Sequence, residues 1–303
     1  MSEHYPRIRT RGKFGAGLIR TGVSIDFYLH PHVEMGQGAI RALDVYLRAV
    51  GPQALSRYAD EEGYFQELGD AILARIRHET LERSRHTIAL SGAPRDEQWY
   101  QFEYRGMRPD LPAMRYVPEA MGAVSFWLPT EYLERHGPGR VRELAMELAS
   151  SLPFLCSGYG GLSFLCNTSV MGVMEEVRKL CFRYPGLDIP EHDSHALYIG
   201  SRVRGPAWLT FLGQPLLGQL GEVAELRSRL RSEGTTVQEM EGDRALITLG
   251  PWPEAGDTER GDTLPAYREL ARVLEPKLYH QERGHCFEFT AEDRLRWERR
   301  FLD

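Results

Sequence analysis

The chain has 303 residues, of which 42% are hydrophobic and 26% are charged, and its formal net charge is -6 at pH 7. This composition is ordinary for a globular protein with a sizeable core, and the mild negative charge argues against a nucleic-acid binder, which normally carries a basic domain or stripe. The sequence holds no run of about 18 apolar residues and its N-terminus lacks a signal-peptide core, so we expect a cytoplasmic protein that does not bind membranes.

The N-terminal third of the chain predicts alternating strands and helices. In chain order we expect a strand over 22–29, a helix after Gly38, a helix over 64–85, and two strands over 86–90 and 99–104. The Pro-rich segment 107–118 predicts a linker. It would join an N-terminal α/β part, 1–106, to a C-terminal α/β part, 119–303, with both packed as one compact unit.

The C-terminal part continues this alternation. Strands are expected over 123–128, 161–166, within 204–213, and over 235–240 and 244–249; helices are expected up to Leu152, over 171–183, 222–231, 265–278 and 291–301. Gly158 to Gly161 predicts a tight turn before the strand at 161–166. These elements predict an α+β fold in which helices cover a mixed or antiparallel sheet.

The segment from Arg204 to Gly213 resembles two other parts of the chain. Shifted back by 84 residues, it lays Leu212 on Leu128 and the later Gly221 on Gly137; shifted back by 183 residues, it lays them on Leu29 and Gly38. The pattern indicates either repeated strand–turn–helix units or a chance match of two common residue types.

Metal-type ligands gather at His192, Asp193 and His195, which follow Pro190 in an expected loop. A metal-dependent hydrolase could use such a group, but a loop lacks the rigid frame that ligands need, so a solvated segment is the favoured interpretation. The four cysteines lie in apolar contexts without a Cys-x-x-Cys pair, which favours buried thiols over a zinc site. We predict that the chain is not an enzyme and holds no metal or cofactor.

Aromatic and acidic residues indicate a binding surface instead. Trp99, Tyr100 and Glu103 belong to the predicted hairpin, in which we expect aromatic side chains on both faces. Acidic residues recur in expected loops and turns, among them Asp60 to Glu62, Glu191, Asp193, Glu239, Glu241 and Asp243. Gathered in space, they would complement a basic partner; otherwise they form an ordinary solvated surface.

Four segments together resemble one bacterial family. They are Arg204 to Gly213 with Leu220 and Gly221, Val124 to Pro129, Ser157 to Leu162, and Thr290 to Phe301. In order and spacing they are similar to the type VI immunity family for VRR-NUC toxins, the TsiV family. The resemblance spans about Ile25 to the end of the chain.

This resemblance implies an immunity protein, or antitoxin, of a type VI secretion system. Such a protein is non-catalytic and binds a cognate nuclease effector in the cytoplasm, where it blocks DNA cleavage. We hypothesise that Trp99, Tyr100, Glu103, Glu191, Asp193, Glu239, Glu241 and Asp243 contact the toxin. The alternatives are the metal-dependent hydrolase above and a structural or regulatory binding module without a toxin partner.

Overall fold

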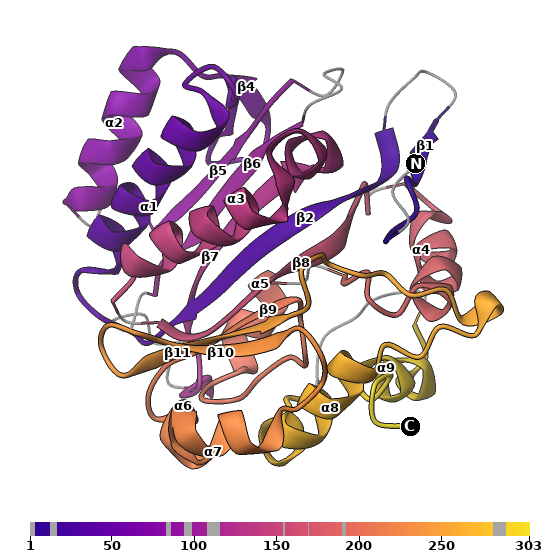
Figure 1. The fold of residues 1–303 in the computed structure, drawn as a ribbon. Coiled ribbons are helices and arrows are strands. Elements are labelled where there is room, and N and C mark those ends of the chain that lie inside the picture. Colours follow the sequence, from indigo (N-terminus) through magenta and orange to yellow (C-terminus); the bar gives the residue numbers. More distant parts are fainter. Residues whose placement is uncertain are drawn as a thin grey trace.

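Figure 1 shows the computed structural model of the chain. It describes residues 4–12, 17–82, 86–93, 99–107, 116–153, 155–168, 170–189, 192–280 and 289–303. Most of the predicted linker and Glu191 therefore lie outside the described residues, and nothing is said of the side chains of His192 and Asp193.

An antiparallel sheet of 11 strands runs through the molecule. The strands are β1 (Arg9–Arg11), β2 (Gly17–Leu29), β3 (Arg57–Ala59), β4 (Phe65–Glu67), β5 (Thr87–Ser91), β6 (Gln101–Arg105), β7 (Gly122–Pro129), β8 (Leu155–Cys166), β9 (Leu209–Leu212), β10 (Thr235–Met240) and β11 (Arg244–Leu249). Their order is β10-β11-β9-β8-β2-β7-β6-β5-β3-β4, and β1 pairs with β2 beside this path. Every pair between these strands is antiparallel.

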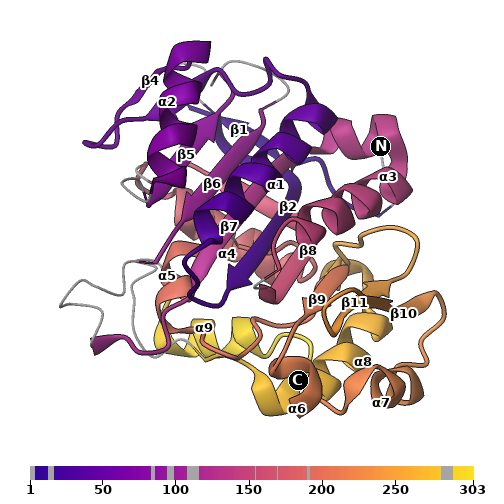
Figure 2. The same ribbon diagram turned by 90° about the vertical axis from the view of Figure 1, so that its left-hand side faces the viewer.

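Helices cover both faces of this sheet. They are α1 (Met35–Val50), α2 (Asp70–Leu81), α3 (Thr130–Ser150), α4 (Val173–Arg183), α5 (His192–Tyr198), α6 (Leu216–Gln219), α7 (Glu222–Arg229), α8 (Pro265–Leu274) and α9 (Ala291–Glu298). In Figure 2, α1, α2 and α3 lie on the face turned to the viewer, and α4, α5 and α9 lie behind the sheet. The α+β prediction is confirmed.

The sheet is continuous across the predicted linker. Strand β6, on one side of 107–118, pairs along its whole length with β7 on the other side, from Gln101 opposite Trp127 to Arg105 opposite Ala123. The two predicted parts therefore share one sheet, and their division at the linker stays a prediction.

Strand β2 is the centre of the fold because it is buried on both faces. On the side of α1 and α3, Phe27 packs edge-to-face against Phe126 and Phe211, with ring centroids 6.4 and 5.3 Å apart. Asp26 and Tyr28 point to the other face, since side chains alternate along a strand, and both are buried. Burial of a carboxylate on this second face requires compensating partners.

The glycine-rich run from Gly158 to Gly161 lies inside β8, so the predicted tight turn is wrong. Glycine usually weakens a strand, but here it admits side chains from both neighbouring strands. A Cβ on Gly158 would come within 2.5 Å of the Phe27 ring, and a Cβ on Gly160 within 3.1 Å of Leu209. Close packing of β2, β8 and β9 explains these glycines.

Two further local predictions differ from the structure. Residues 192–198 form helix α5 and not a loop. The helix expected over 64–85 begins only at Asp70, because residues 65–67 form β4 and pair with β3. In both cases tertiary contacts override a weak local pattern.

Three strand–helix units correspond to the internal similarity: β2 with α1, β7 with α3, and β9 with α6 and α7. The aligned Leu29, Leu128 and Leu212 are all fully buried at strand ends. Gly137 breaks α3 at a φ of 76°, and Gly221 separates α6 from α7 at a φ of 101°. The third aligned glycine, Gly38, lies inside α1, so only the second and third units share this break.

Candidate functional site

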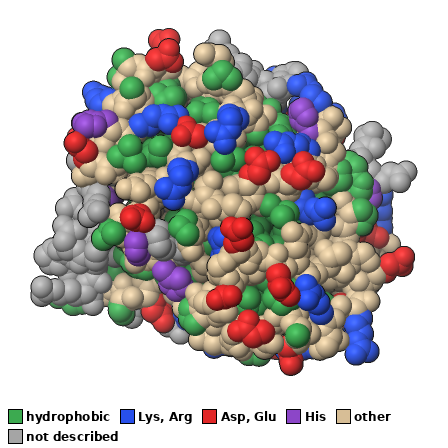
Figure 3. Space-filling model, turned by 60° about the vertical axis from the view of Figure 1, so that its left-hand side comes forward, with side chains coloured by type: hydrophobic (Ala, Val, Ile, Leu, Met, Phe, Trp, Pro, Cys, Tyr) green, Lys and Arg blue, Asp and Glu red, His purple; other side chains and the backbone are tan. Residues whose placement is uncertain are grey.

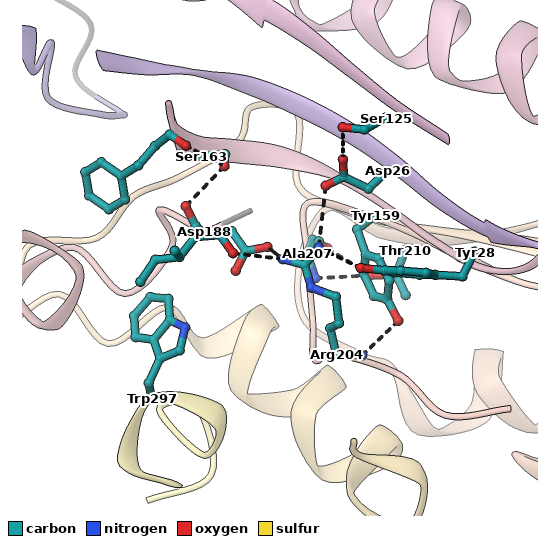
Figure 4. Close-up of polar contacts among 12 residues, drawn as sticks. Asp26, Tyr28, Ser125, Tyr159, Ser163, Asp188, Arg204, Ala207, Thr210 and Trp297 are labelled. Atoms are coloured by element: carbon teal, nitrogen blue, oxygen red, sulfur yellow. Dashed lines mark hydrogen bonds and ion pairs between the residues drawn. The ribbon is translucent and has the colours of Figure 1, made fainter. Parts of the chain in front are cut away.

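Arg204 is the hub of a buried polar cluster on the second face of the sheet (Figure 4). Its side chain is 6% exposed, and its guanidinium forms ion pairs with Asp26 of β2 and with Asp188, which follows α4. The Arg204 Nη1 also lies 3.5 Å from the Tyr28 hydroxyl. One arginine thereby joins the central strand to a distant connecting segment.

The partners of Arg204 are themselves held in place. The Ser125 hydroxyl donates a hydrogen bond to the Asp26 carboxylate. The backbone of Asp188 forms two hydrogen bonds with β8: the Phe164 N–H donates to the Asp188 carbonyl at 2.9 Å, and the Asp188 N–H donates to the Leu162 carbonyl at 2.9 Å. Arg300, beyond α9, lies 3.6 Å from Asp188. Two arginines therefore face two aspartates, which balances the buried charge.

Burial and charge act in opposite directions on these groups. Burial tends to lower the pKa of Arg204, but Asp188, Tyr28 and Asp26 outweigh it and hold that pKa well above its usual range. Burial lowers the pKa of Arg300 to about 10, although Asp188 opposes the shift. Both arginines therefore stay protonated at neutral pH.

Other groups of the segment 204–213 form hydrogen bonds with distant parts of the chain. The Arg204 N–H donates to the Tyr159 hydroxyl at 2.8 Å, and the Trp208 Nε1 donates to the Gly250 carbonyl at 3.2 Å. Trp208 is 1% exposed. The segment that is most distinctive in the sequence therefore has a structural role, because its side chains bind to residues of the same chain.

A small cavity of about 70 Å³ lies beside the cluster. It is lined by Arg204, Arg300 and aromatic side chains that include Trp208 and Trp297. A volume of this size is enough for a few water molecules, since one water needs only about 10–15 Å³ of such space.

The chemistry of a metallohydrolase finds no support in the described residues. Among them, no group of three or more His, Cys, Asp or Glu side chains is placed to hold a metal ion. His195 is partly buried and packs edge-to-face on Tyr279 at 5.7 Å. Cys156 is a buried free thiol, and burial raises its pKa to about 12, so it is protonated at neutral pH and not a nucleophile.

The predicted hairpin exists as β5 and β6, and three of its aromatic residues share one face. Tyr100, Phe102 and Tyr104 are all buried, and Tyr100 packs edge-to-face on Tyr46 of α1 and Tyr132 of α3. Trp99 has the opposite parity, so the shared face of these three residues does not contradict the expectation of aromatic side chains on both faces. Trp99 and Glu103 are half-buried. With 7% exposure, Tyr100 can support a binding surface but offers little of its own.

Three of the predicted acidic residues lie together at one edge of the sheet. Glu239 is the penultimate residue of the edge strand β10, and Glu241 and Asp243 belong to the turn between β10 and β11. All three are exposed, and Glu239 pairs with Arg227 of α7 at 3.1 Å. On the face drawn in Figure 3, acidic side chains are interspersed with basic ones and form no continuous patch.

The predicted contact residues do not converge on one place. The strand order puts six strand-to-strand steps between β6 and β10. At about 4.8 Å per step this is roughly 29 Å along the sheet. Trp99 and Glu103 therefore cannot share the centre of one interface of standard size with Glu239, Glu241 and Asp243.

Helix α9 is tied to the second face of the sheet by Asp293. Both of its carboxylate oxygens accept hydrogen bonds from Arg178 of α4 at 2.8 Å, and Asp293 forms a capping box with Thr290. The hydrogen bonds from Arg178 are the main reason that the pKa of Asp293 falls to about 2. Because this pKa lies below that of an unfolded aspartate, the stabilisation is complete above about pH 4 and is lost as the pH falls towards 2.

Replacement Asp293→Asn is therefore expected to lower the melting temperature at pH 7 by roughly 2–4 °C. Between pH 4 and pH 2 the difference from the wild type should shrink, since the wild-type carboxylate becomes protonated there. Differential scanning calorimetry across this range checks both statements. The exposed neighbour Glu292→Gln is the matched control, and a constant difference between Asp293→Asn and wild type at all pH values would contradict the expectation.

This chain matches a known protein family in sequence over most of its length. It is an α+β protein whose distinctive residues are structural, and the family described as type VI immunity for VRR-NUC matches residues 39–301, so the chain belongs to that family. The Pseudomonas aeruginosa T6SS protein PA0821 has a similar fold, with a TM-score of 0.75 over 97% of this chain and 87% of that chain at 19% sequence identity. No curated protein matches the sequence.

Proposed function

We propose that this protein binds the nuclease domain of a type VI effector of the VRR-NUC class and keeps it inactive in the cytoplasm. The observation that carries the proposal is membership of the type VI immunity family over residues 39–301. Elementary electrostatics supports it, because a nuclease needs a basic surface to bind phosphates and this chain has a net charge of -6. In the described parts of the chain, no helix has the length and hydrophobicity to span a membrane.

Co-expression with a cognate VRR-NUC nuclease tests the proposal. The two proteins should co-purify, and DNA cleavage by the purified nuclease should stop when the two are equimolar. Cells that express the nuclease should survive only when this chain is present. Full inhibition at a small fraction of the nuclease concentration would instead indicate catalytic inactivation and reject a stoichiometric inhibitor. Absence of binding would reject the function altogether.

We propose further that Glu239, Glu241 and Asp243 speed capture of the basic nuclease by long-range attraction. Their neutralisation in the triple variant Glu239→Gln, Glu241→Gln, Asp243→Asn should lower the association rate at low salt roughly 3–10-fold and weaken its salt dependence. Asparagine suits position 243, where φ is 52°, because it tolerates this conformation well. Stopped-flow mixing with the nuclease measures the rate.

The control removes the same charge elsewhere. The triple variant Glu175→Gln, Glu176→Gln, Glu292→Gln changes α4 and α9 and should alter the association rate less than about twofold. Equal effects of the two variants would show that the association rate depends only on net charge and not on the position of the charges in the β10–β11 turn. Contacts through Trp99, Tyr100, Glu103, Glu191 and Asp193 stay predictions.

A further inference from the structure

The edge hairpin, which we define as residues 57–67 with strands β3 and β4, is the part of the described surface that the fold explains least. Strand β4 lies at the end of the strand order and pairs only with β3. Every residue from Glu61 to Glu67 is exposed. Strands at an edge are commonly protected by charged side chains, and Glu67 has that role, but exposed aromatic residues protect no edge.

Two adjacent aromatic side chains stand out in the edge hairpin. Tyr64 is 70% exposed and Phe65 is 40% exposed. Neither packs into the core, so the stability of the fold does not require them. Large aromatic side chains that lie in the open and next to each other are the residues that most often become energetic anchors when a partner covers them.

The edge hairpin is held rigid by its own polar contacts. The Asp60 carboxylate accepts from Tyr64 N–H at 2.7 Å and from the Gln66 side chain at 2.8 Å, and the Gln66 hydrogen bond is the main cause that lowers the pKa of Asp60. The Arg57 guanidinium lies over the Phe65 ring, 5.6 Å from its centroid. A rigid hairpin loses little conformational entropy on binding, which favours affinity.

Three exposed carboxylates belong to the same hairpin as the aromatic pair. Within the described parts of the chain, no ion pair joins Glu61, Glu62 or Glu67 to a basic side chain. Carboxylates attract arginine and lysine, and the faces of Tyr64 and Phe65 can stack on the same cations. The chemistry of this surface therefore fits an arginine- or lysine-rich protein surface.

Two other occupants fit less well. Strand addition along β4 is hindered because the carbonyl of Phe65 already accepts a hydrogen bond from Arg57. A second copy of this chain, docked about a two-fold axis, would bring Glu61, Glu62 and Glu67 against their own copies, and like charges repel.

We infer that the edge hairpin is the anchoring contact for the nuclease, with Tyr64 and Phe65 packed against basic side chains of its nucleic-acid cleft and Glu61, Glu62 and Glu67 in place of phosphates. This inference rests on the proposed function. The edge hairpin lies nine strand-to-strand steps from β10 in the strand order. The β10–β11 turn is proposed to raise the association rate, which is a different role. The edge hairpin governs the lifetime of the complex.

The test uses the full chain and the purified VRR-NUC nuclease in surface plasmon resonance. The double variant Tyr64→Ala, Phe65→Ala should raise Kd at least about 30-fold, mainly through faster dissociation. The variant Glu61→Gln, Glu62→Gln, Glu67→Gln should also weaken binding and reduce its salt dependence. Because the replaced side chains are exposed, both variants should melt within about 2 °C of the wild type.

Tyr116→Ala is the matched control, since Tyr116 is 84% exposed and lies outside the edge hairpin; it should change Kd less than about threefold. If the wild type binds the nuclease and the double variant binds equally well, the edge hairpin is not the anchor, and the proposed function stands. If the double variant instead turns a dimer into a monomer at unchanged nuclease affinity, the surface serves self-association and the inference fails. If the wild type itself does not bind, the proposed function and this inference fall together.

Discussion

Replacement of Arg204 by alanine is expected to lower the free energy of unfolding by about 3–5 kcal/mol. The reason is that Asp26 is fully buried and would lose the arginine that compensates its charge, while Asp188, which is partly buried, would keep only Arg300. Removal of one partner from a buried ion pair costs more than the pair itself contributes, because the remaining charge is left uncompensated. Urea unfolding followed by tryptophan fluorescence measures the loss.

The neighbouring Arg202 provides the control for this experiment. Its side chain is 35% exposed, pairs with Glu119 at the surface and donates to the Ile199 carbonyl, so Arg202→Ala should cost about 1–2 kcal/mol, less than Arg204→Ala. In addition, Arg204→Met combined with Asp26→Asn should recover part of the loss, because fewer buried charges remain unpaired. Equal stability of Arg204→Ala and Arg202→Ala would show that the cluster does not hold the sheet and the C-terminal segment together.

Replacement Gly213→Ala is expected to cost about 3 kcal/mol, or roughly 5–10 °C in melting temperature. Gly213 follows β9, and its N–H donates to the Cys156 carbonyl at 2.7 Å. A Cβ at this position would lie 2.0 Å from the Leu155 carbonyl oxygen. The obstacle is backbone and not a flexible side chain, so β8 and β9 must move apart to admit one methyl group.

Gly139→Ala is the opposite case in the same chain. Gly139 lies in α3, and a Cβ there meets no atom within 4 Å. Alanine should therefore be neutral or stabilise the helix by up to about 1 kcal/mol. Thermal unfolding of the two variants side by side checks both expectations. A melting temperature for Gly213→Ala as high as for Gly139→Ala would mean that the approach of β8 and β9 is not tight.

Sequence patterns predicted the secondary structure correctly where neighbouring residues determine it. Strands β10 and β11 have the predicted bounds, because alternation and the turn at Glu241 to Asp243 are both encoded within a few residues. Alternation likewise places Phe102 and Tyr104 of β6 on one face, and both are buried.

Local patterns failed where the cause lies elsewhere in the chain. The sequence pattern predicts that Phe65 belongs to a helix over 64–85, but pairing with β3 places it in an exposed edge strand. The glycines of β8 are typical of a turn when only the sequence is considered. In the structure they lie in a strand, because Phe27 and Leu209 occupy the space beside them. No sequence pattern in residues 192–198 predicts helix α5.

Periodicity, turn residues and family motifs are properties of short segments, so the fold class, most of the elements and the family can be predicted from the sequence. The role of those motifs depends on contacts between distant segments. Arg204 meets Asp26 and Asp188 because the register of the central strands and the backbone pairing of Asp188 with β8 bring distant segments together. Exposure was decided in the same way, since whether Tyr64, Phe65 or Tyr100 can reach a partner depends on which helices cover which face of the sheet.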